Sequence, residues 1–137
     1  MRLFLDSPAL AKRYIQERGT KIVLESCSNA KEIFLSILCI PETISACNRL
    51  LREKKMPVKA YRELKEALSG DVNTSTLVTL DYSVLRGTIL CLEKTPVRTL
   101  DAIQIASAKV ARCDLFLTAD SRQAVAATTL DLKVLVV

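Results

Sequence analysis

The chain has 137 residues, half of them hydrophobic, and its 20 Lys and Arg residues against 15 Asp and Glu residues give a formal net charge of +5. It has no His, which excludes Ser-His-Asp triads, histidine acid–base catalysis and His-ligated zinc; its three glycines are isolated, which excludes P-loops and G-x-G-x-x-G turns. The length predicts one domain over residues 1–137, in which any catalysis must use carboxylates, lysines, hydroxyls or thiols.

The first half of the chain predicts two strands and three helices. Leu3–Leu5 and Ile33–Ile40 are apolar runs without period-2 alternation, as in strands that are buried on both faces of a parallel sheet. A serine cap, a proline in the first turn and a glycine stop indicate a helix over Pro8–Arg18. Pro41–Lys55 and Pro57–Leu68 also begin with proline and place apolar residues at helical spacing.

The second half begins with a predicted loop over Ser69–Thr76, where polar and turn-forming residues cluster. Helices are predicted over Tyr82–Glu93 and over about Thr99–Arg112, with the threonine as a cap. Leu115–Thr118 is a further strand, followed by a short helix, and Lys133–Val137 is the last strand. Strands that alternate with helices predict an α/β fold, a three-layer α/β/α sandwich with a mostly parallel central sheet.

The cysteines and the apolar runs indicate a compartment. Five cysteines, an odd number without a C-x-x-C pair, lie in apolar stretches and are interpreted as buried hydrophobic residues in a reducing cytoplasm. No apolar run approaches about 18 residues, and the N-terminus turns polar too early for a signal sequence. We therefore expect a soluble, cytoplasmic protein that has no contact with a membrane.

Four acids fall where predicted strands end or predicted helices begin. Asp6 and Asp120 follow strands, and Glu42 and Asp101 lie in the first turns of helices. Each alone has a structural explanation, because capping and the helix dipole favour carboxylates at helix N-termini. In a parallel sheet, however, ligands collect at the carboxyl ends of the strands, so all four are expected to project into one crevice. Divalent cations or protonation would relieve their repulsion, and carboxylates without imidazole or thiolate are ligands for Mg²⁺ or Mn²⁺.

A bound Mg²⁺ ion would supply chemistry that a chain without His lacks, since it lowers the pKa of water and stabilises charge on a phosphodiester. With the four acids set aside, 11 acids remain against 20 bases, so the rest of the surface is basic. Four of these bases form the end of one predicted helix, where they also complement the helix dipole: Arg49, Arg52, Lys54 and Lys55. An acidic metal site within a basic surface suits a nucleic-acid backbone better than a small metabolite.

Three segments resemble the motifs of the PIN domain family, and within it the small VapC-type toxins. Leu3–Lys12 resembles the opening strand, where an Asp precedes small hydroxyl residues and Ala. Thr99–Ala108 resembles the helix motif T-L-D-A-L-H-L-A-T-A, and Asp114–Arg122 resembles a strand that ends in T-x-D. Two positions depart from the family's pattern: Pro8 stands where a second Ser or Thr is usual, and Gln104 replaces a frequent His at a position outside the metal shell.

The resemblance implies roles for these residues. The four acids would be both the catalytic and the metal-binding residues of a Mg²⁺- or Mn²⁺-dependent endoribonuclease that hydrolyses RNA: Asp6, Glu42, Asp101 and Asp120. Ser7, Lys12 and Arg122 are candidate substrate-binding residues, although the two basic side chains are also typical of an ordinary surface. The resemblance further implies the toxin of a toxin–antitoxin pair, with a cognate antitoxin as a partner and a homodimer as the assembly.

Two other functions stay open from the sequence. A PIN-like module that binds RNA or protein but is catalytically silent is one, because Pro8 alters the first motif. A phosphotransfer domain phosphorylated at Asp6 is the other. That chemistry needs D-x-D or an adjacent acid pair at the strand end, where this chain has Ser7 and Pro8.

Overall fold

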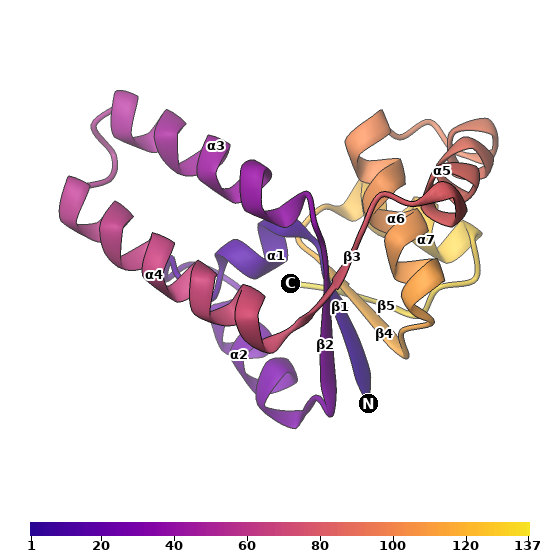
Figure 1. Cartoon of the computed structure of the whole chain (residues 1–137), viewed down its shortest axis with the longest axis horizontal. Helices are drawn as coiled ribbons and strands as arrows, with labels where there is room; N and C mark the ends of the chain where they lie inside the picture. The colour runs from indigo at the N-terminus through magenta and orange to yellow at the C-terminus, as the bar shows by residue number, and fades with distance from the viewer.

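A computed structural model describes residues 1–137, and five strands form a single sheet in it (Figure 1). The strands are β1 (Arg2–Leu5), β2 (Glu32–Ser36), β3 (Thr76–Val78), β4 (Leu115–Thr118) and β5 (Val134–Val136). Their order is β3-β2-β1-β4-β5, and every neighbouring pair is parallel. The central strand β1 is therefore paired with a parallel strand on each side. This confirms the parallel sheet predicted from the apolar runs.

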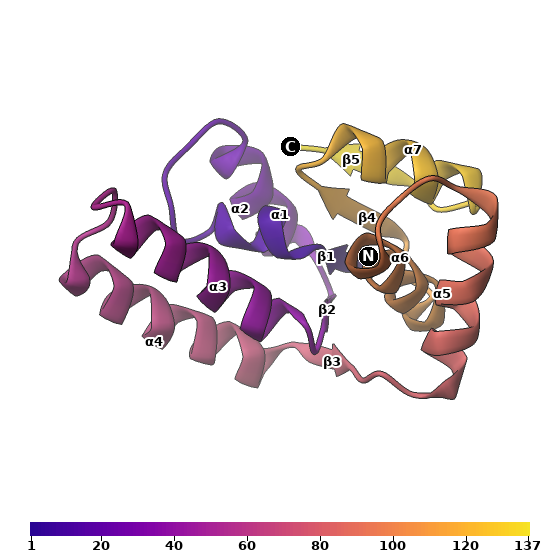
Figure 2. The same cartoon turned by 90° about the horizontal axis from the view of Figure 1, so that it is seen from above.

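Helices cover both faces of this sheet. They are α1 (Ser7–Ala11), α2 (Thr20–Asn29), α3 (Cys39–Arg52), α4 (Val58–Thr74), α5 (Tyr82–Lys94), α6 (Thr99–Ala111) and α7 (Ser121–Thr129). Two views place α1 to α4 on one side and α5 to α7 on the other, with the α3–α4 hairpin extending away from the sheet (Figures 1 and 2). The three-layer α/β/α sandwich is thus confirmed.

The side chains of β1 point alternately to the two faces of the sheet, and a hydrophobic core lies on each face. Leu3 and Leu5 are fully buried against α1, α2 and the buried end of α4. Phe4 points to the opposite face, where its ring lies 5.7 Å from that of Phe116 and packs against α5, α6 and α7. Successive strand residues point to opposite faces, so an unbroken apolar run fills both layers.

The predicted helix over Pro8–Arg18 is wrong in length, because α1 ends at Ala11. The N–H groups of Arg13 and Tyr14 bond carbonyls only three residues back, which tightens the chain into a turn. Both side chains then reach Asp71 of α4: Arg13 through two hydrogen bonds of 2.8 Å and Tyr14 through one of 2.7 Å. The contacts with Asp71, far along the chain, therefore end this helix. The helix α2, which follows, was not predicted.

The predicted loop over Ser69–Thr76 is also wrong, since α4 continues to Thr74 and β3 begins at Thr76. Gly70 inside a helix costs about 1 kcal/mol relative to Ala. The contacts of Asp71 and the buried Leu68 offset this cost.

The second strand is shorter than predicted, because β2 ends at Ser36 instead of Ile40. The Oγ of Ser36 accepts a hydrogen bond from the N–H of Leu38 at 3.2 Å, and the chain turns there into α3. The other predicted helices and strands agree with the structure to within a few residues. All the helices are too short or too polar to span a bilayer.

Candidate functional site

Asp6 is fully buried directly after the central strand. Its Oδ1 accepts a hydrogen bond from the N–H of Ala9 at 2.8 Å, so Asp6 caps α1 and the predicted Ser7 cap is wrong. Its Oδ2 is buried without a hydrogen-bond partner. Burial raises the pKa of Asp6 to about 7, although the nearby Thr118 hydroxyl and the N–H of Ala9 act to lower it, and the charges of Glu42 and Asp101 raise it further. Such a carboxylate favours a proton or a cation beside it.

Glu42 lies in the first turn of α3, as predicted, and is fixed through one oxygen. Its Oε1 accepts hydrogen bonds from Ser7 Oγ at 3.1 Å and from Gln104 Nε2 at 2.7 Å. Gln104 is buried on α6, and its Nε2 is also 3.0 Å from Ser7 Oγ. This triangle joins α1, α3 and α6. Sequence reasoning missed that contribution of Gln104, although the residue lies one turn after Asp101 on the same helix.

Asp101 and Asp120 begin two helices on the other side of the sheet. Asp101 lies in the first turn of α6, whose cap residue is Arg98 without a side-chain bond, so the predicted Thr99 cap is wrong. Burial raises the pKa of Asp101, and the charge of Asp120 adds to the effect. Asp120 caps α7, because its Oδ1 accepts a hydrogen bond from the N–H of Arg122 at 2.8 Å.

Two polar residues that were not predicted as site residues, Thr118 and Gln123, support these two acids. The N–H of Asp120 donates to Thr118 Oγ1 at 3.0 Å, and that hydroxyl donates to Gln123 Oε1 at 3.1 Å. Gln123 Nε2 in turn donates to the carbonyl of Asp101 at 3.3 Å. The end of β4 is thereby tied to α6 and α7. The T-x-D pattern was the available signal for Thr118, whereas nothing in the sequence singled out Gln123.

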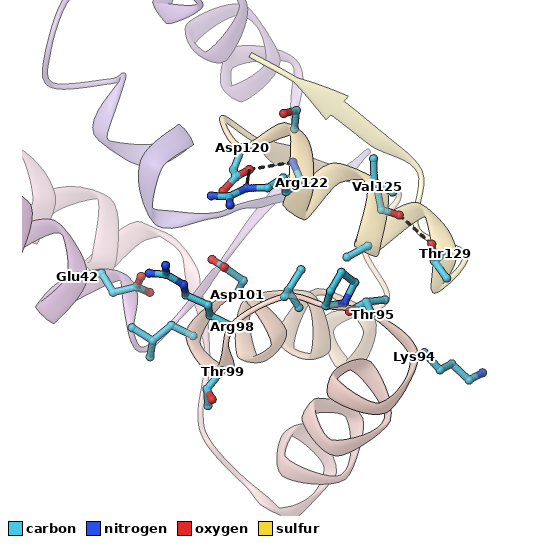
Figure 3. Close-up of a pocket in the computed structure, with 15 residues that line it drawn as sticks. Glu42, Lys94, Thr95, Arg98, Thr99, Asp101, Asp120, Arg122, Val125 and Thr129 are labelled. Carbon is cyan, nitrogen blue, oxygen red and sulfur yellow. Dashed lines mark hydrogen bonds and ion pairs between the residues drawn. The ribbon is translucent and has the colours of Figure 1, made fainter.

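Three of the four acids line one open cavity of about 890 Å³, namely Glu42, Asp101 and Asp120 (Figure 3). We call this cavity the acidic crevice. Asp6 is buried and does not line it, although it is close enough to Glu42 and Asp101 for their charges to affect its pKa. The expectation that all four acids project into one crevice therefore holds for three of them, and Asp6 lies buried nearby. No three acidic or thiol side chains, however, are grouped closely enough to form a preformed metal site.

The candidate substrate-binding residues occupy different places. Ser7 is buried beneath Glu42. The guanidinium of Arg122 is 3.8 Å from the Asp120 carboxylate, and its side chain is 86% exposed at the wall of the crevice. Lys12 does not line the crevice, and its ammonium donates to the carbonyl of Arg18 at 2.6 Å. That contact holds the turn between α1 and α2.

Comparison with known families decides which fold this is. The family model of the PIN domain matches residues 3–128. The chain belongs to the PIN domain family. The five-stranded parallel sheet with helices on both faces is therefore a PIN fold, and the resemblance seen in the three sequence motifs is confirmed.

Solved structures similar to this PIN domain include two toxin–antitoxin systems and a toxin. A toxin–antitoxin complex from Klebsiella pneumoniae is 16% identical, with a TM-score of 0.65, and 88% of each chain is covered. VapBC2 from Rickettsia felis, bound to a DNA fragment from its promoter, is 9% identical with a TM-score of 0.71, and the match covers 100% of this chain and 99% of that one.

The toxin is Mycobacterium tuberculosis VapC20, which is described as cleaving the sarcin-ricin loop. It is 11% identical with a TM-score of 0.66, and the match covers 90% of this PIN domain and 94% of that chain. At these identities the similarity establishes the fold alone. No curated protein sequence matches the chain.

Proposed function

We propose that this PIN domain is a Mg²⁺- or Mn²⁺-dependent endoribonuclease and the toxin of a toxin–antitoxin pair. The observation that supports the proposal is that Glu42, Asp101 and Asp120 line one crevice, while the charges of Glu42 and Asp101 reach the buried carboxylate of Asp6. The similarity to a toxin that cleaves the sarcin-ricin loop supports RNA as the substrate class.

The residues present fit a hard divalent cation. All the candidate ligands are carboxylates, and the buried Oδ2 of Asp6 makes no well-formed hydrogen bond within the protein. We therefore assign the cation to Asp6, Glu42, Asp101 and Asp120. When bound, the cation lowers the pKa of water and stabilises the charge that develops on a phosphodiester oxygen.

The protein's own groups orient the acids and the substrate. Gln104 and Ser7 donate hydrogen bonds to Oε1 of Glu42 and so fix the orientation of its carboxylate. The other oxygen, Oε2, accepts no hydrogen bond from the protein. Arg122 lines the crevice beside Asp120, and Arg98 extends from beside Asp101 toward Glu42, so both offer guanidinium groups to a backbone phosphate (Figure 3). Hydrolysis adds water across a P–O bond, and these groups position the strand for it.

The partners form part of the same proposal. Two of the similar structures are toxin–antitoxin systems, which supports a cognate antitoxin for this chain. The homodimer implied by the family resemblance stays a prediction, and light scattering coupled to size-exclusion chromatography would measure it.

Cleavage of a labelled RNA tests the nuclease directly. We expect cleavage in Mg²⁺ or Mn²⁺ that excess EDTA abolishes, and an Asp101→Asn variant that is slower by at least about 100-fold, since even the residues that only support metal ligands typically contribute 10- to 100-fold. Asp131→Asn is the matched control, because Asp131 is an exposed acid outside the crevice and its left-handed backbone, with a φ of 63°, tolerates Asn. Full activity in EDTA, or equal activity of the two variants, would contradict the proposal.

A second candidate, the catalytically silent binding module, is favoured by one observation: no three acids are closely grouped. RNA binding without cleavage in any metal, unchanged by Asp101→Asn, would support it. The phosphotransfer alternative is disfavoured because Asp6 is fully buried and a phosphodonor could not reach it.

A further inference from the structure

A second groove, of about 560 Å³, adjoins the acidic crevice along α3. Glu42 and Leu100 line both cavities, so the two adjoin at these residues. Arg49 and Arg52 line the groove farther along the same helix. We call it the α3 groove. It provides a path that leads away from the acids and ends at two positive charges.

Helix geometry places these charges in a row. Glu42, Ser45, Arg49 and Arg52 are three or four residues apart, so they share one face of α3. With a rise of 1.5 Å per residue, the two arginines lie about 10 and 15 Å along the axis from Glu42. Ser45 and Ala46, which also line the groove, have small side chains that leave the path open between the acid and the arginines.

The two arginines have no acidic partner. Both are exposed, and neither forms an ion pair, whereas Arg13 is paired with Asp71. Glu42, at the end shared with the crevice, is the one acid that lines the groove. The helix dipole explains cations near the end of α3, but it does not explain why these two continue the row that starts at Glu42.

We propose that Arg49 and Arg52 bind backbone phosphates of the RNA strand whose scissile bond lies in the acidic crevice. This inference rests on the proposed function, since it takes RNA as the substrate. A strand held at the crevice has to leave it, and the α3 groove adjoins the crevice at Glu42 and Leu100. No aromatic side chain lines the groove, so it contacts the backbone and does not stack bases. The two arginines therefore add affinity without sequence preference.

The test measures RNA binding as a function of salt. A labelled single-stranded RNA is titrated with the protein in EDTA, which prevents cleavage under the proposed function, and fluorescence anisotropy gives the binding constant at several KCl concentrations. Each phosphate contact contributes about 0.7 to the slope of log K against log salt for a single strand. The Arg49→Ala/Arg52→Ala variant is therefore expected to reduce that slope by about 1.4, and in Mg²⁺ to raise KM for cleavage while kcat stays unchanged.

The matched control is Lys59→Ala/Arg62→Ala. These two exposed cations lie on α4 of the same hairpin, do not line the α3 groove, and remove the same charge from the protein. We expect their loss to leave the slope unchanged. Equal reductions in both variants would mean that overall charge alone attracts RNA, and this result would overturn the inference.

Other outcomes separate the inference from the proposed function. If the wild-type protein cleaves RNA in Mg²⁺ but the arginine variant keeps the wild-type slope and KM, the groove assignment fails and the nuclease stands. If the wild-type protein neither binds nor cleaves RNA, the proposed function itself fails. A polyglutamate peptide is a further probe. If the arginine variant loses binding of this peptide, the control variant keeps it, and RNA binding is unchanged in both, then the groove binds an acidic protein segment and the inference is overturned.

Discussion

Two buried residues, Asp6 and Gln104, show how single side chains prepare the site. Gln104 fixes one oxygen of Glu42 and leaves the other without a protein donor. One carboxylate oxygen of Asp6 caps α1, and the other is buried without a hydrogen bond of good geometry. In the absence of a cation, this second oxygen is a source of instability, because burying an ionised carboxylate without compensation is unfavourable. The cost depends on pH, since a proton can neutralise the group.

The pH dependence has a definite sign. The pKa of Asp6 is raised from 3.8 to about 7, so the folded protein binds this proton more tightly than the unfolded chain does. Its contribution to the free energy of unfolding is fully present below about pH 4 and is lost as the pH rises through about 7. At 1.36 kcal/mol for each unit of pKa shift, the loss is at most roughly 4 kcal/mol.

An Asp6→Asn variant should remove this contribution. Asparagine keeps the acceptor for the Ala9 N–H and cannot ionise, so urea unfolding in EDTA should show less loss of stability between pH 5 and pH 8 than in the wild-type protein. The Asp131→Asn variant serves as the comparison, since it changes the same charge at an exposed position. Parallel pH profiles for the wild-type and Asp6→Asn proteins would show that Asp6 titrates normally.

At the scale of elements, the turn after α1 depends on α4. Asp71 accepts hydrogen bonds from both Arg13 and Tyr14. Burial and the nearby Asp71 raise the pKa of Tyr14, so its hydroxyl stays protonated and donates. The hydrogen bonds of Asp71 with Arg13 and Tyr14 hold the α3–α4 hairpin against the segment after α1. The helix α3 of this hairpin carries Glu42. The hairpin and the candidate site are therefore linked through one partly buried ion pair.

Replacing Asp71 with Ala should destabilise the protein by about 2 to 3 kcal/mol. The estimate lies between the values for exposed and for fully buried pairs, because the Arg13 and Asp71 side chains are 23% and 20% exposed. Urea unfolding measures the change. The control is Glu25→Ala, which breaks the exposed Lys21–Glu25 pair on α2 and should cost less than about 0.5 kcal/mol. Similar losses in the two variants would mean that the Asp71 contacts add little.

The difference between local patterns and contacts made far along the chain explains which elements could be predicted from the sequence. The strand β4 and the helix α5 were predicted to within a residue, because their apolar runs and boundaries are local. The helix α2 was not predicted, since Ile22 and Leu24 are exposed between buried residues and blur its helical period. Three-residue β3 buries only Val78 and is defined mainly by pairing with β2, which a local pattern cannot show.

For the whole molecule, the parallel topology made the end of the sheet predictable as the place of the site. All five strands point in one direction, so the acids that follow β1 and β4 lie at the same edge. The spacing of the acids could not be predicted, because it depends on how α3, α6 and α7 pack against the sheet. Gln104 and Gln123 join these layers through hydrogen bonds, but the motif position of Gln104 and the residues around Gln123 do not indicate these contacts.

This arrangement couples metal binding to the stability of the entire fold. A cation that binds the folded protein at 100 times its Kd adds about 2.7 kcal/mol, which corresponds to roughly 10 °C in Tm for a domain of this size. Thermal unfolding should therefore shift upward in Mg²⁺ or Mn²⁺. Because protons compete for Asp6 below about pH 7, the shift should be larger at pH 8 than at pH 6.

Three comparisons identify where the cation acts. Asp101→Asn should lose the metal-induced shift in Tm, Asp131→Asn should retain it, and KCl of equal ionic strength should not reproduce it. Burial and the charge of Asp120 already raise the pKa of Asp101, so its amide variant should also be at least as stable as the wild-type protein in EDTA. A shift that persists in Asp101→Asn, or that is equal at the two pH values, would place the bound cation away from the acidic crevice.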